Sequence, residues 1–312
     1  MTWPTKRRYT LIKGKYWIHY PDIPKQGPEP DGDTVRFEPD NMQSVRNLPW
    51  HSGRGPAFNR RKNIAVRYEG IDTLETHFNR AHQHLQFANA ARDENLRLLG
   101  FRKVVFFTDQ PNKVQSVEKN PLPGYVIANG IEANGRLLGL AYSGTSGGAS
   151  DLTDGEKIFV DEDLQSQSVN AKLVEAGLSY VEPYDTMPLS LIAHLRKLIA
   201  GARSMPGKGF WTHEDVNTRK EVQIGDFAKL ETLVLWPKLF RRLATYFSEG
   251  NSGLAQFDTW VRKDPIHRDD ALRLPDGEKG NMHNTYIISG DSLKLQFNPE
   301  ELLIEPDPKR IF

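Results

Sequence analysis

The stretch IAVRYEGIDTLET, residues 64–76, decides how this chain folds and where its chemistry is concentrated. Its first eight residues are rich in apolar, β-branched and aromatic side chains, which predicts a β-strand ending near Ile71. The turn that leaves the strand carries Asp72 and Glu75, and Arg67 lies within the strand itself. One short segment therefore supplies the guanidinium of Arg67 and the carboxylates of Asp72 and Glu75, which an apolar core has no use for.

Regular elements are predicted on both sides of this segment. Apolar residues at helical spacing predict helices at 80–99, 168–176 and 189–203. Strands and helices that are segregated along the chain indicate an α+β fold, in which we expect the strands to close a small barrel. Runs of β-branched and aromatic residues predict the other strands, at 10–13, 16–19, 34–37, 103–107 and 137–142.

The last hundred residues have a different pattern. Residues 227–247 have a strong helical periodicity that Pro237 should kink or divide, and residues 255–262 predict another helix. Two apolar runs joined by a Ser-Gly-Asp turn predict a hairpin at 285–297. A polar stretch at 212–225 marks the predicted domain boundary. It separates a first domain, 8–211, from a smaller mixed α/β C-terminal domain of unknown role, 226–312.

The composition is that of a soluble globular protein and excludes several kinds of site. Of the 312 residues, 38% are hydrophobic and 26% are charged, and the formal net charge is +1. This charge gives no overall attraction to nucleic acid, so any basic surface must be local. The absence of cysteine excludes disulfides and thiolate metal sites. We see no signal peptide and no apolar run that could span a bilayer, so we expect a cytoplasmic protein without a membrane partner.

Two further motifs complete a set of residues suited to phosphate chemistry. Asp31 and Asp33 lie just before the strand at 34–37, and Gly135-Arg136 opens the strand at 137–142. Carboxylates are ligands that Ca²⁺ and Mg²⁺ prefer, and a nearby carboxylate can accept a proton from water. A planar guanidinium can bind two phosphate oxygens. Each motif alone is commonplace, since Asp-Gly-Asp usually forms a turn and Asp-Thr-x-Glu usually caps a helix.

In this order and spacing, the motifs resemble those of the staphylococcal nuclease family, also called thermonucleases or micrococcal nucleases. The resemblance covers residues 8–211 discontinuously and does not reach the last hundred residues. It implies an OB-type five-stranded β-barrel with packed helices, and an activity that cuts DNA and RNA with little sequence preference and leaves 3′-phosphates. The matching stretches are 10–13, 31–35, 67–76, 135–136, 140–142, 169–170, 173–174 and 177–178.

The resemblance also implies a Ca²⁺ site. Asp33 and Asp72 would bind the cation through their side chains, and Thr73 would bind it through its backbone carbonyl. Asp31 would support these ligands without touching the cation. Mg²⁺ or Mn²⁺ are the alternative cations.

The same resemblance implies three catalytic residues. Glu75 would act as general base toward the attacking water, while Arg67 and Arg136 would bind the scissile phosphate. The chain departs from the family at Leu74, where the family has a proline. It departs again at residues 133–134, where the family often has a lysine and a tyrosine at its nucleotide pocket.

An insert at residues 41–62 predicts contact with nucleic acid. It contains no acidic residue, and aromatic side chains alternate with its basic ones, which suits phosphate attraction and base stacking. A solvated loop is the alternative. The predicted nucleic-acid-binding residues are Arg54, Arg60, Arg61 and Lys62 in this insert, and Tyr180 and Tyr184 as the nearest matches to the family's base-stacking tyrosines.

The combined pattern predicts a Ca²⁺-dependent endonuclease acting on DNA or RNA. One alternative is a non-catalytic nucleic-acid-binding module that retains the barrel. Another is a scaffold that binds a protein partner or a second copy through residues 226–312. All five charged positions of the motifs are filled, which favours the enzyme. The segment 151–163, with six acids and one lysine, is either a solvated loop or a flap that competes with nucleic acid.

Overall fold

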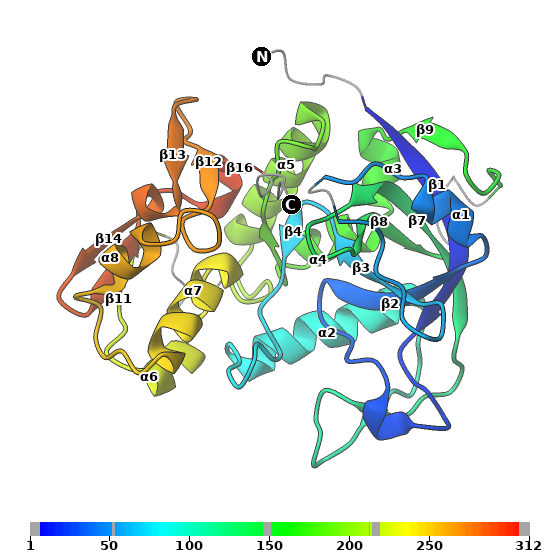
Figure 1. The fold of residues 1–312 in the computed structure, drawn as a ribbon, viewed down its shortest axis with the longest axis horizontal. Coiled ribbons are helices and arrows are strands. Elements are labelled where there is room, and N and C mark those ends of the chain that lie inside the picture. The colour runs from blue at the N-terminus through cyan, green and yellow to red at the C-terminus, as the bar shows by residue number, and fades with distance from the viewer. Residues whose placement is uncertain (1–6, 52–53, 146–150, 212, 214–218, 306–312) are drawn as a thin grey trace.

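The computed structural model describes residues 7–51, 54–145, 151–211, 213 and 219–305 (Figure 1). Within these residues five strands close a mixed barrel in the order β2-β3-β8-β7-β1, and pairing of β1 with β2 completes it. β3 and β8 run parallel, whereas the other neighbours are antiparallel. The predicted α+β fold with a small barrel is confirmed. The strands are β1 (Arg8–Trp17), β2 (Thr34–Pro39), β3 (Ile64–Tyr68), β7 (Leu122–Ile131) and β8 (Leu137–Ser143), with β9 (Lys157–Phe159) added outside β1.

Strand β7 pairs with both β1 and β8 and has no counterpart in the predicted strands. Its sequence contains Pro123, Gly124, Asn129 and Gly130, which are residue types typical of turns. The barrel needs a small residue at Gly124, because a Cβ there would lie 2.2 Å from a ring carbon of Tyr16. Close packing against a neighbouring strand, rather than strand propensity, therefore selects this sequence.

Helices α2, α4 and α5 contribute their apolar faces to the barrel core. α4 begins as predicted, since Ser168 Oγ accepts a hydrogen bond from the backbone N–H of Ala171 at 3.1 Å. α2 starts at Leu85 rather than near residue 80, because residues 78–81 form a short bridge. The bounds are α1 (Met42–Arg46), α2 (Leu85–Leu99), α3 (Glu162–Ser166), α4 (Val169–Glu175) and α5 (Leu189–Ser204).

The predicted strand 64–71 divides at a turn. Gly70 has φ +80°, which a residue with a side chain rarely adopts, and a Cβ there would lie 2.7 Å from Leu195. The chain then leaves the barrel as β4 (Ile71–Asp72), which pairs with β10 (Tyr180–Val181). This turn directs the chain away from β3. Asp72 nevertheless stays within hydrogen-bond distance of the Arg67 side chain.

Residues 219–305, called the C-terminal unit below, contain helices and short sheets at one side of the barrel (Figure 1). Pro237 divides the predicted helix 227–247 and becomes the first residue of the second part. The predicted hairpin is present as β14 and β15. The helices are α6 (Phe227–Glu231), α7 (Pro237–Ser248) and α8 (Phe257–Arg262). The described strands form two sheets, β11 (Glu221–Gln223)-β15 (Ser292–Leu295)-β14 (Tyr286–Ser289) and β13 (Lys279–Asn281)-β12 (Ala271–Arg273)-β16 (Leu303–Ile304).

Smaller elements complete the described chain. Strands β5 (Val105–Phe106) and β6 (Val114–Ser116) form a separate ribbon. Single 3₁₀ turns occur at η1 (Pro24–Gln26), η2 (Met282–Thr285) and η3 (Pro299–Glu301). None of the helices in the described part of the chain is long and apolar enough to cross a membrane.

The C-terminal unit shares an apolar core with the first part of the chain. Leu74, Tyr180 and Phe210 belong to the same buried cluster as α7 and the strands of the unit. Polar contacts reinforce this packing: Trp236 Nε1 donates to Glu182 at 2.9 Å. Part of the predicted boundary, at 212 and 214–218, lies outside the described residues. The shared core fixes the position of α7 relative to the barrel.

A pH dependence of stability follows from Glu69, which is buried between β3 and β4. Burial raises the pKa of Glu69 to about 7, although a hydrogen bond from Asn129 partly offsets the effect. Between pH 4.5 and 7 the folded state therefore holds a proton that the unfolded state has lost. Stability from this group falls as pH rises through that window, by about 3 kcal/mol in total.

We expect Glu69→Gln to abolish this fall, so that the variant gains stability relative to wild type as the pH is raised from 5 to 8. Urea unfolding at both pH values measures the difference. Glu118→Gln, at an exposed glutamate paired with Lys103, is the matched control and should show no such gain. An equal stability difference between Glu69→Gln and wild type at the two pH values would contradict the assignment.

Candidate active site

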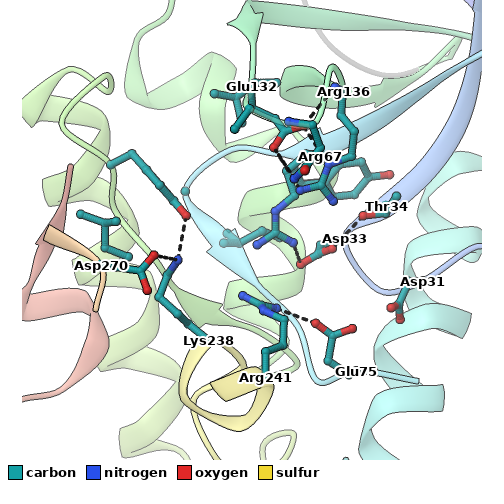
Figure 2. Close-up of a pocket in the computed structure, with 18 of the residues that line it drawn as sticks. Asp31, Asp33, Thr34, Arg67, Glu75, Glu132, Arg136, Lys238, Arg241 and Asp270 are labelled. Atoms are coloured by element: carbon teal, nitrogen blue, oxygen red, sulfur yellow. Dashed lines mark hydrogen bonds and ion pairs between the residues drawn. The ribbon is translucent and has the colours of Figure 1, made fainter. Parts of the chain in front are cut away.

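A cavity of about 570 Å³ lies between the barrel and the C-terminal unit. Its walls bring together residues that are far apart in the sequence (Figure 2). The barrel side contributes most of the predicted site residues, and α7 contributes three cations. The charged lining residues used below are Asp31, Asp33, Arg67, Glu75, Glu132, Arg136, Lys238, Arg241, Arg242 and Asp270.

Asp33 and Asp72 converge on Arg67. β2 and β3 pair with Thr34 opposite Arg67, so the residue before Thr34 lies beside the arginine. Arg67 donates one N–H to Asp33 and another to Asp72, at 2.6 Å from Nη2 to Oδ1. The backbone N–H of Thr73 also donates to Asp33, at 3.0 Å. The fold thus assembles the two carboxylates that the sequence assigns to the cation.

Asp31 supports this arrangement from the loop before β2. Its carboxylate accepts hydrogen bonds from the N–H of Gly32 at 2.8 Å and the hydroxyl of Thr76 at 3.2 Å. Its backbone carbonyl accepts the amide of Asn95 at 2.7 Å, which ties the loop to α2. Burial and the nearby charge of Glu75 raise the pKa of Asp31. Asp31 fixes the loop geometry, and its support of a cation site stays a prediction.

Glu75 follows Asp72 by three residues, and its side chain is 15% exposed. Gln83 fixes its backbone, because the N–H of Glu75 donates to the Gln83 side chain at 3.1 Å and the Gln83 N–H donates to the Glu75 carbonyl at 2.9 Å. Burial raises the pKa of Glu75; Arg241 opposes this, and the charges of Asp72 and Asp33 add to it. Glu75 is therefore more basic than an ordinary surface carboxylate.

Arg136 opens β8 after a tight turn at Gly135, where φ is +78°. Glu132 holds the guanidinium by accepting from Nε at 3.1 Å and from Nη2 at 3.3 Å. Burial would raise the pKa of Glu132, but the charge of Arg136 outweighs it and the pKa is lowered. In Figure 2, Arg136 and Arg67 lie on the same side of the cavity. Glu132 was not among the predicted site residues. A glutamate four residues before an arginine across a hairpin does indicate an ion pair, so the sequence contained a sign of it.

Arg241 on α7 is a second residue that was not among the predicted site residues. Its Nη2 donates to Asp72 Oδ2 at 2.9 Å, and its Nη1 donates to Glu75 Oε1 at 2.5 Å. Asp72 is thereby held between two arginines. Burial alone would raise the pKa of Asp72, but the charges of Arg241 and Arg67 hold it well below its usual range.

The other cations of α7 both pair with Asp270 of the C-terminal unit, and Lys238 also reaches residues of the barrel side. Lys238 lies 3.4 Å from Asp270 and 3.7 Å from Glu182, and it donates to the Tyr184 hydroxyl at 3.3 Å. Arg242 donates to Asp270 at 2.6 Å. A spacing of three and four residues on a helix directs Lys238 and its neighbours toward one face, so the sequence did contain a signal for a basic wall.

The predicted nucleic-acid-binding residues are dispersed. Arg54, Arg60 and Lys62 are exposed, and Arg61 pairs with Asp22, but the described cavity lining includes none of these four basic residues. Tyr184 does line the cavity.

Tyr180 does not fit its predicted stacking role. Its ring is completely buried against Phe210 and Trp211, and its hydroxyl donates to the carbonyl of Val234 at 3.2 Å. Its apolar ring is part of the core that joins the C-terminal unit to the barrel, so it offers no face to a base.

The donor set of the site suits a hard divalent cation. Asp33 and Asp72 present carboxylate oxygens to one guanidinium, so the same oxygens can be shared by one cation of smaller size. The net charge of the paired groups is −1, because three carboxylates pair with two guanidiniums. The carboxylates are those of Asp33, Asp72 and Glu75, and the guanidiniums are those of Arg67 and Arg241. Among the described residues, no group of three or more His, Cys, Asp or Glu side chains is placed to hold a metal ion.

No protein-family model matches the chain, and no curated protein matches it either. The resemblance to staphylococcal nucleases therefore stays a prediction from the motifs, and the site is interpreted from its own geometry.

The network predicts different costs for two neutralising substitutions. Asp72→Asn should destabilise the fold by about 3–5 kcal/mol, because an amide N–H would face an arginine and leave its buried charge unpaired. Glu75→Gln should cost about 1 kcal/mol or less, because the amide oxygen can still accept from Arg241 and carboxylate repulsion is relieved. Urea unfolding at pH 7 measures both, and equal costs would contradict the central role of Asp72.

Proposed function

We propose that the protein is a Ca²⁺-dependent endonuclease of the staphylococcal nuclease type, which hydrolyses phosphodiester bonds in DNA or RNA and leaves 3′-phosphates. The observation that supports this most is the convergence of Asp33, Glu75, Arg67 and Arg136 on one cavity, with Asp72 buried behind them and paired to Arg67. Phosphodiester hydrolysis needs a cation site, a base for water and groups that stabilise negative charge on phosphate. This cavity offers all three.

Asp33 and Asp72 would hold the cation, assisted by the backbone carbonyl of Thr73. When bound, a divalent cation supplies positive charge that polarises the phosphate and favours attack at phosphorus. Mg²⁺ or Mn²⁺ would bind the same oxygen ligands with different geometric demands. The hydrogen bond from the Thr73 N–H to Asp33 keeps that carboxylate oriented toward the site.

Glu75 would accept the proton of the attacking water. A carboxylate with a raised pKa is a better base near neutral pH than an exposed one, and Glu75 has such a pKa. The water oxygen forms the new bond to phosphorus while the bond to the 5′-oxygen breaks. The 5′-oxygen takes up a proton, so the products are a 5′-hydroxyl and a 3′-phosphate.

Arg67 and Arg136 would bind the nonbridging phosphate oxygens and stabilise the charge that accumulates on them. Glu132 orients Arg136 through two hydrogen bonds, so its guanidinium is positioned before substrate arrives. Arg67 pairs with Asp33 and Asp72, and a cation on these carboxylates would free its N–H groups for the phosphate.

The test is cleavage of single-stranded DNA, duplex DNA and RNA in Ca²⁺, Mg²⁺ or a chelator. We expect cleavage by wild type in Ca²⁺ and none in chelator. Glu75→Gln should lower the rate by about 10²–10⁴-fold, because the base is lost. Arg136→Ala should lower it by about 10²–10³-fold, because one charge-stabilising group is lost.

Arg262→Ala is the control, since this arginine on α8 pairs with Asp258 at the surface and does not line the described cavity. It should cleave like wild type. Equal rates for all variants would refute the assigned residues. Binding of nucleic acid by wild type without cleavage in any cation would instead favour a non-catalytic binding module.

A further inference from the structure

We propose that Arg241 is a third arginine for the substrate phosphate, supplied to the barrel site by the C-terminal unit. It pairs with Asp72 and Glu75 in the cation-free state and turns to the phosphate when a divalent cation takes over these carboxylates. This inference rests on the proposed function and gives residues 226–312 a part in it.

The contacts of Arg241 match those of Arg67. Arg67 bridges Asp33 and Asp72, while Arg241 bridges Asp72 and Glu75, and both line the same cavity. Both guanidiniums bind the carboxylate of Asp72: Arg67 donates to Oδ1, and Arg241 donates to Oδ2 at 2.9 Å and to Oδ1 at 3.2 Å. A cation held by Asp72 would displace both arginines in the same way, since each uses oxygens that a cation would share.

The helix that carries Arg241 is docked firmly beside the barrel. Just before α7, the carbonyls of Val234 and Leu235 accept hydrogen bonds from Tyr180 at 3.2 Å and Gln83 at 2.9 Å. Trp236 donates to Glu182 at 2.9 Å and is completely buried. These contacts do not involve the site carboxylates, so displacement of the Arg241 side chain leaves the helix in position. The guanidinium therefore stays within reach of a phosphate in the cavity.

The neighbouring cations on α7 are held differently. Lys238 pairs with Asp270 of the C-terminal unit (Figure 2) and also lies 3.7 Å from Glu182 on the barrel side. Arg242 pairs with Asp270 as well. The acidic partners of Arg241 are Asp72 and Glu75, the two residues assigned to the cation and to the attacking water. Lys238 and Arg242 thus share an acid that is given no part in the reaction, whereas both acids that hold Arg241 are given one.

Charge balance also favours a phosphate role. Without a cation, the three paired carboxylates exceed the two guanidiniums by one negative charge. A divalent cation changes this to one positive charge, which one phosphodiester neutralises. Because the side chains of Arg241 and Asp72 are only 18% and 1% exposed, an uncompensated charge here is costly. Arg241 supplies the charge that makes the cation-bound site complementary to a single phosphate.

The experiment compares wild type, Arg241→Gln, Arg241→Lys and the surface control Arg262→Gln by titration calorimetry. Ca²⁺ alone should bind Arg241→Gln at least about 10-fold more tightly than wild type, because a competing cation is gone. Thymidine 3′-phosphate in saturating Ca²⁺ should bind it at least about 10-fold more weakly, because a charged donor is lost. Its cleavage rate at saturating substrate should fall about 100-fold. Arg262→Gln should match wild type throughout.

Arg241→Lys keeps the charge without the planar fork, so it should retain the Ca²⁺ affinity of wild type and bind the nucleotide with intermediate affinity. If circular dichroism shows that Arg241→Gln does not fold, the nucleotide affinity of Arg241→Lys decides whether Arg241 binds phosphate. Unchanged nucleotide affinity in both variants would overturn the proposal and leave Arg241 a structural cation. Tighter Ca²⁺ binding with faster cleavage would overturn it too, because Arg241 would then be an inhibitor.

The two proposals can fail separately. Absence of cleavage by wild type would refute the nuclease function, whereas the calorimetric comparison would still decide whether Arg241 binds phosphate. Cleavage by wild type with no effect of Arg241→Gln on rate or nucleotide binding would refute the role of Arg241 alone.

Discussion

The carboxylate of Asp72 connects the two halves of this protein. Its Oδ1 accepts from Arg67 in the barrel and from Arg241 in the C-terminal unit, and its Oδ2 accepts from Arg241 as well. With only 1% of its side chain exposed, Asp72 is too buried to stay charged without these partners. Each arginine also needs a second acid, which Asp33 and Glu75 provide. A buried ion network of this kind is sensitive to every member, because removing one leaves another unpaired.

The position of Asp72 depends on the backbone around Gly70. A left-handed turn there ends β3, and the following two residues pair with β10 instead of continuing the barrel. Leu195 and Met187 pack so closely at this turn that a side chain would collide with them. The same β10 strand carries Tyr180, whose ring belongs to the core of the C-terminal unit. The turn that presents Asp72 to Arg67 is thus coupled to the interface that delivers Arg241.

The local sequence pattern was sufficient to predict those elements that depend mainly on residues close to one another in the chain. The Ser168 cap of α4, the division of a helix at Pro237 and the β14-β15 hairpin were all predicted and are all present. β7 was missed because its sequence is selected by close contacts with β1 and β8, which local propensity does not record. Local sequence also could not show that Tyr180 is buried. Its aromatic ring is of a kind that stacks on bases, but the fold leaves it completely buried.

The barrel half of the site could be predicted because its charged residues stand in motifs whose order and spacing are informative. Arg241 could not, because its significance lies in contacts with residues 166 and 169 positions away. Along its own helix it is one of several cations between core positions. Its role depends on which acid it meets, and that is set by apolar packing of Trp236 and Tyr180 at the interface. The charge of the barrel site is therefore determined partly by a hydrophobic interface outside it. A sequence change that shifted α7 by one turn would alter the charge at Asp72 without touching any residue of the motifs at 31–34, 67–76 and 135–136.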